Sequence, residues 1–171
     1  TGTLNMAELV TMLPPVQHKR TVRAALAFLT VGSSIKLALF PLHLWLPNAY
    51  TYSPSAVSAF LASTATKVSF YVLARVLFTF FGVALVFTEL RLRLVLLPLA
   101  LFAIYAGSIV AIFQQNAKRL LAYSSVAQIG YMVLGLGMAN VDGLTGGVVH
   151  LFNHALTKGG MFLAVGAVFY R

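Results

Sequence analysis

Long runs of apolar residues, separated by short polar stretches, dominate the pattern of this 171-residue chain. The runs are continuous over about twenty residues and do not alternate strictly, so they predict helices. At 1.5 Å per residue, helices of that length cross the roughly 30 Å hydrocarbon core of a bilayer. The chain is therefore predicted to be an all-α integral membrane protein with about five transmembrane helices, at residues 22–45, 55–81, 92–113, 120–138 and 144–170.

The first predicted helix is expected to be discontinuous around Pro41, which two further prolines follow within residues 40–54. Proline removes a backbone hydrogen bond and disfavours helix at the preceding residue, so this stretch is predicted to be broken or looped. Broken helices in transporters commonly mark an ion site. Alternatively, the stretch forms an interfacial loop that Trp45, Tyr50 and Tyr52 anchor among the lipid headgroups. The pattern leaves both interpretations open.

Composition supports the membrane assignment. The chain is 60% hydrophobic and only 9% charged, whereas about a quarter of the residues in a soluble domain are charged. The net charge of +9 is dispersed along the chain, and several basic residues fall inside apolar runs, so it does not indicate a nucleic-acid partner. The chain has no cysteine, which excludes disulfides and thiolate-ligated clusters within it. No cofactor or catalytic motif is found.

Residues 1–21 are basic and contain prolines, and we expect them to form a loop or the end of a preceding segment. Residues 22–171 are expected to form the membrane domain. The chain starts at Thr1 without a methionine and stops at Arg171 directly after an apolar run. It is therefore expected to be a piece of a longer polypeptide.

Charged residues inside the apolar runs are the first functional signal. Lys67 lies near the middle of the run at 55–81, and Lys36 interrupts the run at 22–45. A charge at that depth costs about 3 kcal/mol or more, so such a lysine indicates an ion or proton pathway.

The last predicted helix carries a polar stripe. His150, His154 and Lys158 are spaced i, i+4 and i+8, which keeps them on one face of a helix. Two histidines at this spacing can bind a metal, but no carboxylate or cysteine accompanies the pair. Structural hydrogen bonding is a second alternative. We favour a proton relay, because histidine titrates near neutral pH and the three groups lie inside a predicted membrane helix.

The fourth predicted helix has a polar side as well, formed by Ser124, Gln128 and Tyr131. Such residues often serve only as interhelical hydrogen-bonding groups in membranes. Lys118 and Arg119 stand at the start of this helix. Their ordinary role would be to anchor the helix by extending toward the headgroups, and this interpretation suits Arg119 best.

Three motifs then resemble a known family. They are IKLALFPLHLWLPNAYTYSPSAVSAFLASTATKVSFYVLAR, NAKRLLAYSSVAQIGYMVLGLG and HLFNHALTKGGMFLAVGA, in this order. The chain resembles the proton-conducting membrane transporter family from about Leu26 onward. That family comprises antiporter-like subunits of respiratory complex I, large subunits of Mrp-type cation/proton antiporters and membrane-bound hydrogenase relatives.

The resemblance implies a proton relay through Lys36, Lys67, Lys118, His150, His154 and Lys158. Lys36 would be the central lysine of a discontinuous helix and Lys67 the bridging lysine of the next. The run VSAFLASTATKVSFY is most similar to the Mrp subunits, and Asn48 stands where the family usually has aspartate. The family's paired glutamate and its last lysine fall outside this chain, which resembles the central third of a subunit with about fourteen helices.

The resulting hypothesis is a proton-translocating, antiporter-like subunit of a complex I-type NADH-quinone oxidoreductase, in a bacterial or mitochondrial inner membrane. Its expected partners are other membrane subunits, the lipid bilayer and, in a complex I-type assembly, redox subunits. No cofactor or metal is expected in this chain, and any electron transfer belongs to partners. The alternatives are an Mrp-type cation/proton antiporter subunit and a structural membrane subunit without transport.

Overall fold

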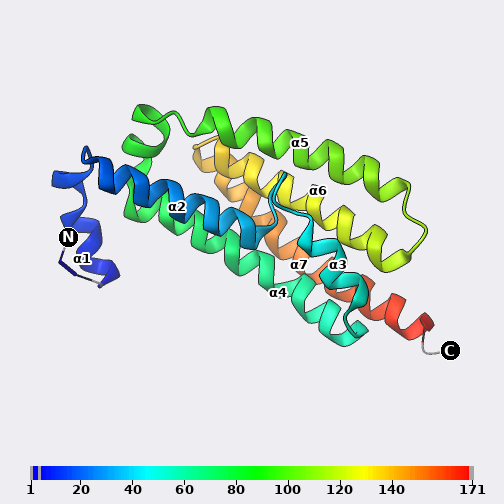
Figure 1. Cartoon of the computed structure of the whole chain (residues 1–171). Coiled ribbons are helices and arrows are strands. Elements are labelled where there is room, and N and C mark those ends of the chain that lie inside the picture. The colour runs from blue at the N-terminus through cyan, green and yellow to red at the C-terminus, as the bar shows by residue number, and fades with distance from the viewer. Residues whose placement is uncertain (1, 4, 170–171) are drawn as a thin grey trace.

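A computed structural model describes residues 2–3 and 5–169, which are mostly helical with no strand among them (Figure 1). The predicted end of the last helix at Tyr170 lies outside the described residues. The helical segments are α1 (Met6–Met12), a 3₁₀ turn at Pro14–Val16, α2 (Arg20–Leu37), α3 (Trp45–Tyr52), α4 (Ser55–Ala74), π-helical turns at Arg75–Phe80 and Ala84–Glu89, α5 (Arg93–Ile112), α6 (Ala117–Gly137) and α7 (Val141–Phe169). Residues 1–21, expected to form a loop or the end of a preceding segment, thus contain a short helix.

Three helical stretches are long and apolar enough to cross a membrane, namely Ser55–Phe80, Arg93–Ile112 and Ala117–Gly137. They correspond to the predicted helices at 55–81, 92–113 and 120–138. Helix α7 is longer, with 29 residues, but its sequence is not apolar enough to count among these candidate membrane spans. The polar stripe lowers the mean hydropathy of α7. Titratable side chains inside a membrane face protein or water and not lipid.

The break in the first predicted helix is confirmed. Helix α2 ends at Leu37, Ala38 takes a left-handed conformation with φ 61°, and helix resumes only at Trp45. Pro41 lies within this break. The indole of Trp45 donates a hydrogen bond to the Ile35 carbonyl, 2.8 Å away, across the break. The same carbonyl also accepts from the Ala38 N–H at 3.0 Å, so the Trp45 bond is a second one that ties α3 to the end of α2.

Two details of this region correct the sequence analysis. Residues 45–52 are helical, although the proline pattern predicts that the whole stretch 40–54 is broken or looped. Pro47 is compatible with α3 because it stands in the first turn, where backbone N–H groups have no helical partner. Tyr50, a candidate headgroup anchor, is instead buried and packs edge-to-face on Phe162 of α7, with 5.6 Å between ring centroids.

Helix α7 also begins earlier than predicted. The sequence indicates a turn over residues 140–143, whereas α7 starts at Val141. The Asn140 side chain accepts a hydrogen bond from the Gly143 N–H at 2.7 Å. Asparagine in this position satisfies an unpaired donor of the first turn, which is why the helix begins directly after it.

Helix α6 lies between α5 and α7, and α4 packs on both α2 and α7 (Figure 1). Small residues permit the close packing of α5 on α6. A Cβ added to Gly130 would lie 2.7 Å from the Ala100 carbonyl, and one added to Gly107 would lie 2.8 Å from the Ala127 nitrogen. This packing brings one face of α7 against both α4 and α6, where the candidate site lies.

Candidate functional site

The polar stripe of α7 is buried at its centre. His154 and Lys158 are each 4% exposed, and His150 is half-buried. The rings of His150 and His154 are stacked, with their centroids 6.2 Å apart and an angle of 6° between their planes. The i, i+4, i+8 spacing therefore produces the single face that the sequence predicts.

Lys67 joins this stripe from α4. Its side chain is 5% exposed, and its Nζ donates a hydrogen bond to the Ala62 carbonyl of its own helix. Helix α4 packs directly on α7, the helix that carries the stripe. The fold thus brings together four sequence-predicted residues, which we call the buried cluster: Lys67, His150, His154 and Lys158.

The polar side of α6 faces the cluster. Lys158 Nζ donates to the Ser124 hydroxyl at 2.8 Å and to the Leu121 carbonyl at 3.1 Å. Tyr131 contacts His150 edge-on, with 5.8 Å between ring centroids and an interplanar angle of 67°. The predicted polar face of the fourth helix is therefore directed at the stripe and not at lipid.

A cavity of about 330 Å³ adjoins the cluster between α6 and α7. Its volume far exceeds the roughly 10–15 Å³ of probe-occupied space that one water needs. We call it the polar cavity. It is lined by Leu120, Leu121, Ser124, Gln128, His150, Asn153, His154, Thr157, Lys158 and Met161.

Several polar atoms at this site have no partner among the described residues. Both ring nitrogens of His154 and Nε2 of His150 are buried without a hydrogen bond. The ion pairs found in residues 2–3 and 5–169 join Glu89 to His18 and to Arg23, so none involves the cluster. Buried polar groups are normally hydrogen-bonded, and these histidines border a cavity in which water can supply the missing bonds.

Two sequence-predicted residues lie apart from the cluster. Lys36 is exposed on α2 in the part of the chain described. Lys118 is half-buried at the start of α6, and its Nζ donates to the Ser53 carbonyl at 3.1 Å, which ties α6 to the turn between α3 and α4. Arg119, interpreted as a headgroup anchor, is half-buried, and its Nε has no hydrogen bond within the described chain.

Sequence reasoning missed His43. This residue lies in the break after α2, is 8% exposed, and has no hydrogen bond to its Nδ1 among the described atoms. Its ring stacks on Phe40 at 5.3 Å and meets Tyr123 of α6 edge-on at 6.3 Å between centroids. The available signal was a histidine two residues after the proline that breaks the helix.

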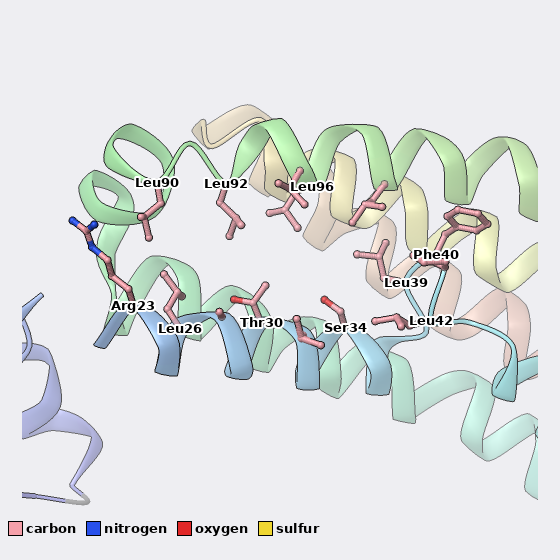
Figure 2. Close-up of a pocket in the computed structure, with 15 residues that line it drawn as sticks. Arg23, Leu26, Thr30, Ser34, Leu39, Phe40, Leu42, Leu90, Leu92 and Leu96 are labelled. Atoms are coloured by element: carbon pink, nitrogen blue, oxygen red, sulfur yellow. The ribbon is translucent and has the colours of Figure 1, made fainter. Parts of the chain in front are cut away.

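A second cavity, of about 360 Å³, separates α2 and the break from α5 (Figure 2). Leu26, Leu39, Leu92 and Leu96 point into it, and Arg23 lies at one end. We call it the apolar cavity. Its described lining contains no histidine or lysine, so it lacks the proton-exchanging groups that mark the polar cavity.

The fold defines an all-helical integral membrane protein. The chain belongs to the NADH:quinone oxidoreductase/Mrp antiporter transmembrane family, whose model matches residues 1–171.

Individual relatives agree with this assignment. NADH-quinone oxidoreductase subunit N of Desulforudis audaxviator is 50% identical over 168 residues, which cover 98% of this chain and 33% of the relative. A Na(+)/H(+) antiporter subunit of Alkalihalophilus pseudofirmus is 34% identical, with coverage of 98% and 33%. A chain of the membrane-bound sulfane sulfur reductase, an archaeal respiratory membrane complex, superposes with a TM-score of 0.87 at 34% identity, covering 98% of this chain and 34% of that one. The chain spans about a third of the length of the curated relatives it matches.

Proposed function

We propose that this chain is the central part of a proton-translocating, antiporter-like membrane subunit of a complex I-type NADH-quinone oxidoreductase. The observation that carries the proposal is the buried cluster, in which Lys67, His154 and Lys158 are each at most 5% exposed. His154 and Lys158 also line the polar cavity. Titratable groups inside a membrane helix bundle are costly and rare, and those that are present typically mark an ion or proton path.

The cluster has the properties a relay requires. A buried lysine gives up its proton more readily than an exposed one, because desolvation and a nearby positive charge both disfavour the ammonium form. Lys67 and Lys158 come from α4 and α7, two helices that pack on each other. His150 and His154 extend this arrangement along α7.

The structural alternative accounts for only part of the cluster. Lys158 has two hydrogen-bond acceptors on α6, as a structural residue would. His154 has no hydrogen bond to either ring nitrogen within the described chain. A histidine retained to hold two helices together needs a protein partner, whereas a histidine that exchanges protons with water takes water as its partner.

Lys36 has a different place in the proposal. It is exposed on α2, and the relatives are about three times as long as this chain. We infer that Lys36 faces a part of the whole protein that is absent here, where the family resemblance implies a glutamate on an earlier helix. Lys118 would serve the relay at the start of α6, whereas Tyr131 lies toward the other end of this helix.

The whole subunit would work among other membrane subunits in a bacterial or mitochondrial inner membrane, with redox subunits supplying electron transfer. The similarity to a NADH-quinone oxidoreductase subunit at 50% identity favours this assembly. An Mrp-type cation/proton antiporter is the second candidate, because a Na(+)/H(+) antiporter subunit matches over the same 98% of the chain.

The test is Lys67→Ala in the full-length subunit, within its purified complex in proteoliposomes. We expect translocation to fall roughly 100-fold, the low end of what a positioned acid–base group contributes, with assembly intact. Lys19→Ala is the matched control, because Lys19 is exposed and lies ahead of α2. Normal pumping by Lys67→Ala would contradict the relay.

The same vesicles separate the two assemblies. Acidification that follows NADH oxidation by quinone supports the complex I type. Acidification that follows an imposed sodium gradient, with no response to NADH, supports the Mrp type.

A further inference from the structure

The apolar cavity follows one side of α2 (Figure 2). Helix α2 packs on α4, and the cavity, with a volume of about 360 Å³, separates it from α5. Its wall on α2 runs from Arg23 past Leu26 and Thr30 to Ser34. Apart from Arg23, Thr30 and Ser34, the described lining is apolar. The volume falls within the roughly 300–1,000 Å³ that ligand pockets occupy, so the cavity is large enough to hold a ligand.

The length of the apolar cavity matches one leaflet of a bilayer. Between Arg23 and Ser34, helix α2 rises by about 16 Å at 1.5 Å per residue. Half of the roughly 30 Å hydrocarbon core is about 15 Å. Beyond Ser34 the lining continues into the break after α2, where Leu39 and Phe40 form the end opposite Arg23 (Figure 2). A cavity of this length and lining suits one acyl chain that enters at Arg23 and ends at the break.

The mouth of the apolar cavity is strongly basic. Two segments meet there, since Glu89 lies 3.8 Å from Arg23. Glu89 is the one acid within residues 18–23 and 89–93. The exposed basic residues of these two segments are Lys19, Arg20, Arg23, Arg91 and Arg93. Basic side chains at the membrane surface attract anionic lipids, and the planar guanidinium group of arginine matches the oxygens of a phosphate. The charge at the mouth therefore complements an anionic phospholipid headgroup.

Arg91 stands between two residues of the cavity wall. Leu90 and Leu92 point into the cavity (Figure 2), whereas Arg91 is exposed. The backbone of Arg91 is left-handed, with φ 48°, a conformation that residues other than glycine rarely adopt. The turn before α5 thus places leucines in the cavity and an arginine outside it within three residues. An amphipathic ligand with an apolar chain and an anionic head requires this combination.

The rest of the subunit is expected to approach α2 from another direction. Lys36 is exposed on α2 and lies outside the described lining of the cavity. A charged side chain inside a membrane faces protein or water and not lipid. Lys36 follows Thr30 by six residues, which places it about a third of a turn away around a helix of 3.6 residues per turn. A segment that covers Lys36 therefore leaves the cavity side of α2 open to lipid.

We propose that the apolar cavity binds one acyl chain of an anionic phospholipid, whose phosphate lies between Arg23 and Arg91 at the mouth. The chain fills the space between α2 and α5 and packs against the leucines of both helices. The lipid site goes beyond the proposed function, because it uses none of the residues of the buried cluster and requires no proton transfer.

The test is photo-crosslinking of the full-length subunit in its complex, in phosphatidylcholine vesicles. The probe is a trace of phosphatidylglycerol or phosphatidylcholine, each with the same diazirine-bearing acyl chain. Phosphatidylglycerol should label Leu96 roughly fivefold more than phosphatidylcholine does, which is the preference that one basic residue gives for an anionic lipid. Tyr105 is the reference, since it is 65% exposed on the same helix and outside the described cavity lining. Both probes should label Tyr105 equally, and equal labelling of Leu96 would overturn the site.

Arginine variants identify the headgroup contact. Arg23→Gln and Arg91→Gln should each lower labelling of Leu96 by phosphatidylglycerol roughly fivefold and leave labelling by phosphatidylcholine unchanged. Arg23 also pairs with Glu89, whereas the ion pairs found in residues 2–3 and 5–169 do not involve Arg91. Arg91→Gln therefore reports on the lipid alone. Arg75→Gln is the matched control, because Arg75 is exposed and outside the described cavity lining. An equal loss for Arg75→Gln would contradict a defined headgroup site.

The position of the diazirine along the acyl chain tests how the lipid is oriented. A diazirine close to the glycerol should label Leu92 near the mouth, and one at the terminal carbon should label Leu39 at the break. The same labelling pattern from both probes would contradict a single chain that enters at Arg23. Absence of label from all lining residues would show that protein covers the cavity in the complex, which would also overturn the proposal.

Discussion

The apolar and polar cavities have nearly the same volume, about 360 and 330 Å³, yet only the polar cavity has histidine and lysine in its described lining. Leucines from α2, the break and α5 surround the apolar cavity (Figure 2). Histidine, lysine and amide groups from α6 and α7 surround the polar cavity. Volume alone therefore does not identify a functional site in a membrane protein. The side chains decide whether water is stable in a cavity, since a buried water needs two to four polar partners.

The comparison is sharpest at one pair of residues. Thr30 in the apolar cavity and His154 in the polar cavity both carry buried atoms without a hydrogen bond in the described chain. The Thr30 hydroxyl has little acid–base chemistry near neutral pH, whereas histidine titrates there. An unpartnered atom is thus informative only together with the chemistry of its group.

The largest expected effect is a difference in proton translocation between variants of these two residues. We expect His154→Ala to lower proton translocation roughly 100-fold, and Thr30→Ala to leave it unchanged. His154→Lys should retain more activity than His154→Ala, because it keeps a titratable group on the same face. Rates in proteoliposomes carrying the full complex measure all three. Wild-type rates for both His154 variants would favour the structural interpretation.

Protein stability, in contrast to proton translocation, should depend more on the apolar cavity than on the polar cavity. Leu96 borders the apolar cavity and is 2% exposed, so Leu96→Ala should destabilise the protein by about 2 kcal/mol, the low end for a buried leucine. The control is Met161→Ala, because Met161 lines the polar cavity but is 44% exposed. Thermal unfolding in detergent compares the two variants. A larger loss for Met161→Ala would contradict the assignment of the apolar cavity to packing.

Ser124 tests the link between α6 and the cluster. Ser124→Ala removes one of the two acceptors of Lys158 and should cost about 1.5 kcal/mol of stability, the low end for a hydrogen bond to a charged group. Ser124→Thr keeps the hydroxyl and should cost less. Chemical unfolding of the two variants gives the difference. Equal losses would show that volume at this position matters more than the hydrogen bond.

The smallest expected effect concerns Lys118, which both bonds Ser53 and is a predicted relay residue. Lys118→Gln should lower stability by about 1 kcal/mol, a typical net value for one hydrogen bond. Lys118→Arg keeps a charged donor, and the arginine side chain does not release its proton in proteins. Proton translocation by Lys118→Arg therefore separates the two roles. Normal pumping would show that Lys118 acts only through its hydrogen bond to Ser53.

Much of the fold was predictable because membrane helices have a strong local signal. Apolar runs located the stretches at 55–81, 92–113 and 120–138, and Pro41 located the break. The early start of α7 was not predicted, because the interpretation of residues 140–143 as a turn overlooked Asn140 as a capping residue. Similarly, α3 was missed because Pro47 was considered without its position in the first turn.

The candidate site was predictable only in part. The stripe on α7 follows from helical periodicity within one segment. That Lys67 would meet the stripe depends on the packing of α4 against α7, which no local pattern encodes. Family resemblance linked them, but it also grouped Lys36 and Lys118 with them. In the structure Lys36 is exposed on α2 and Lys118 bonds Ser53. Cavities lie between helices, so no single segment could indicate them.

The bond from Trp45 to the Ile35 carbonyl has a practical consequence. Trp45 is the only tryptophan in the chain, and its indole spans the break one residue from Lys36. Any movement of α3 relative to the end of α2 must lengthen or break this bond and change the polarity around the ring. The fluorescence of a single-tryptophan version of the whole protein would therefore follow the break in real time, during turnover and without an added label.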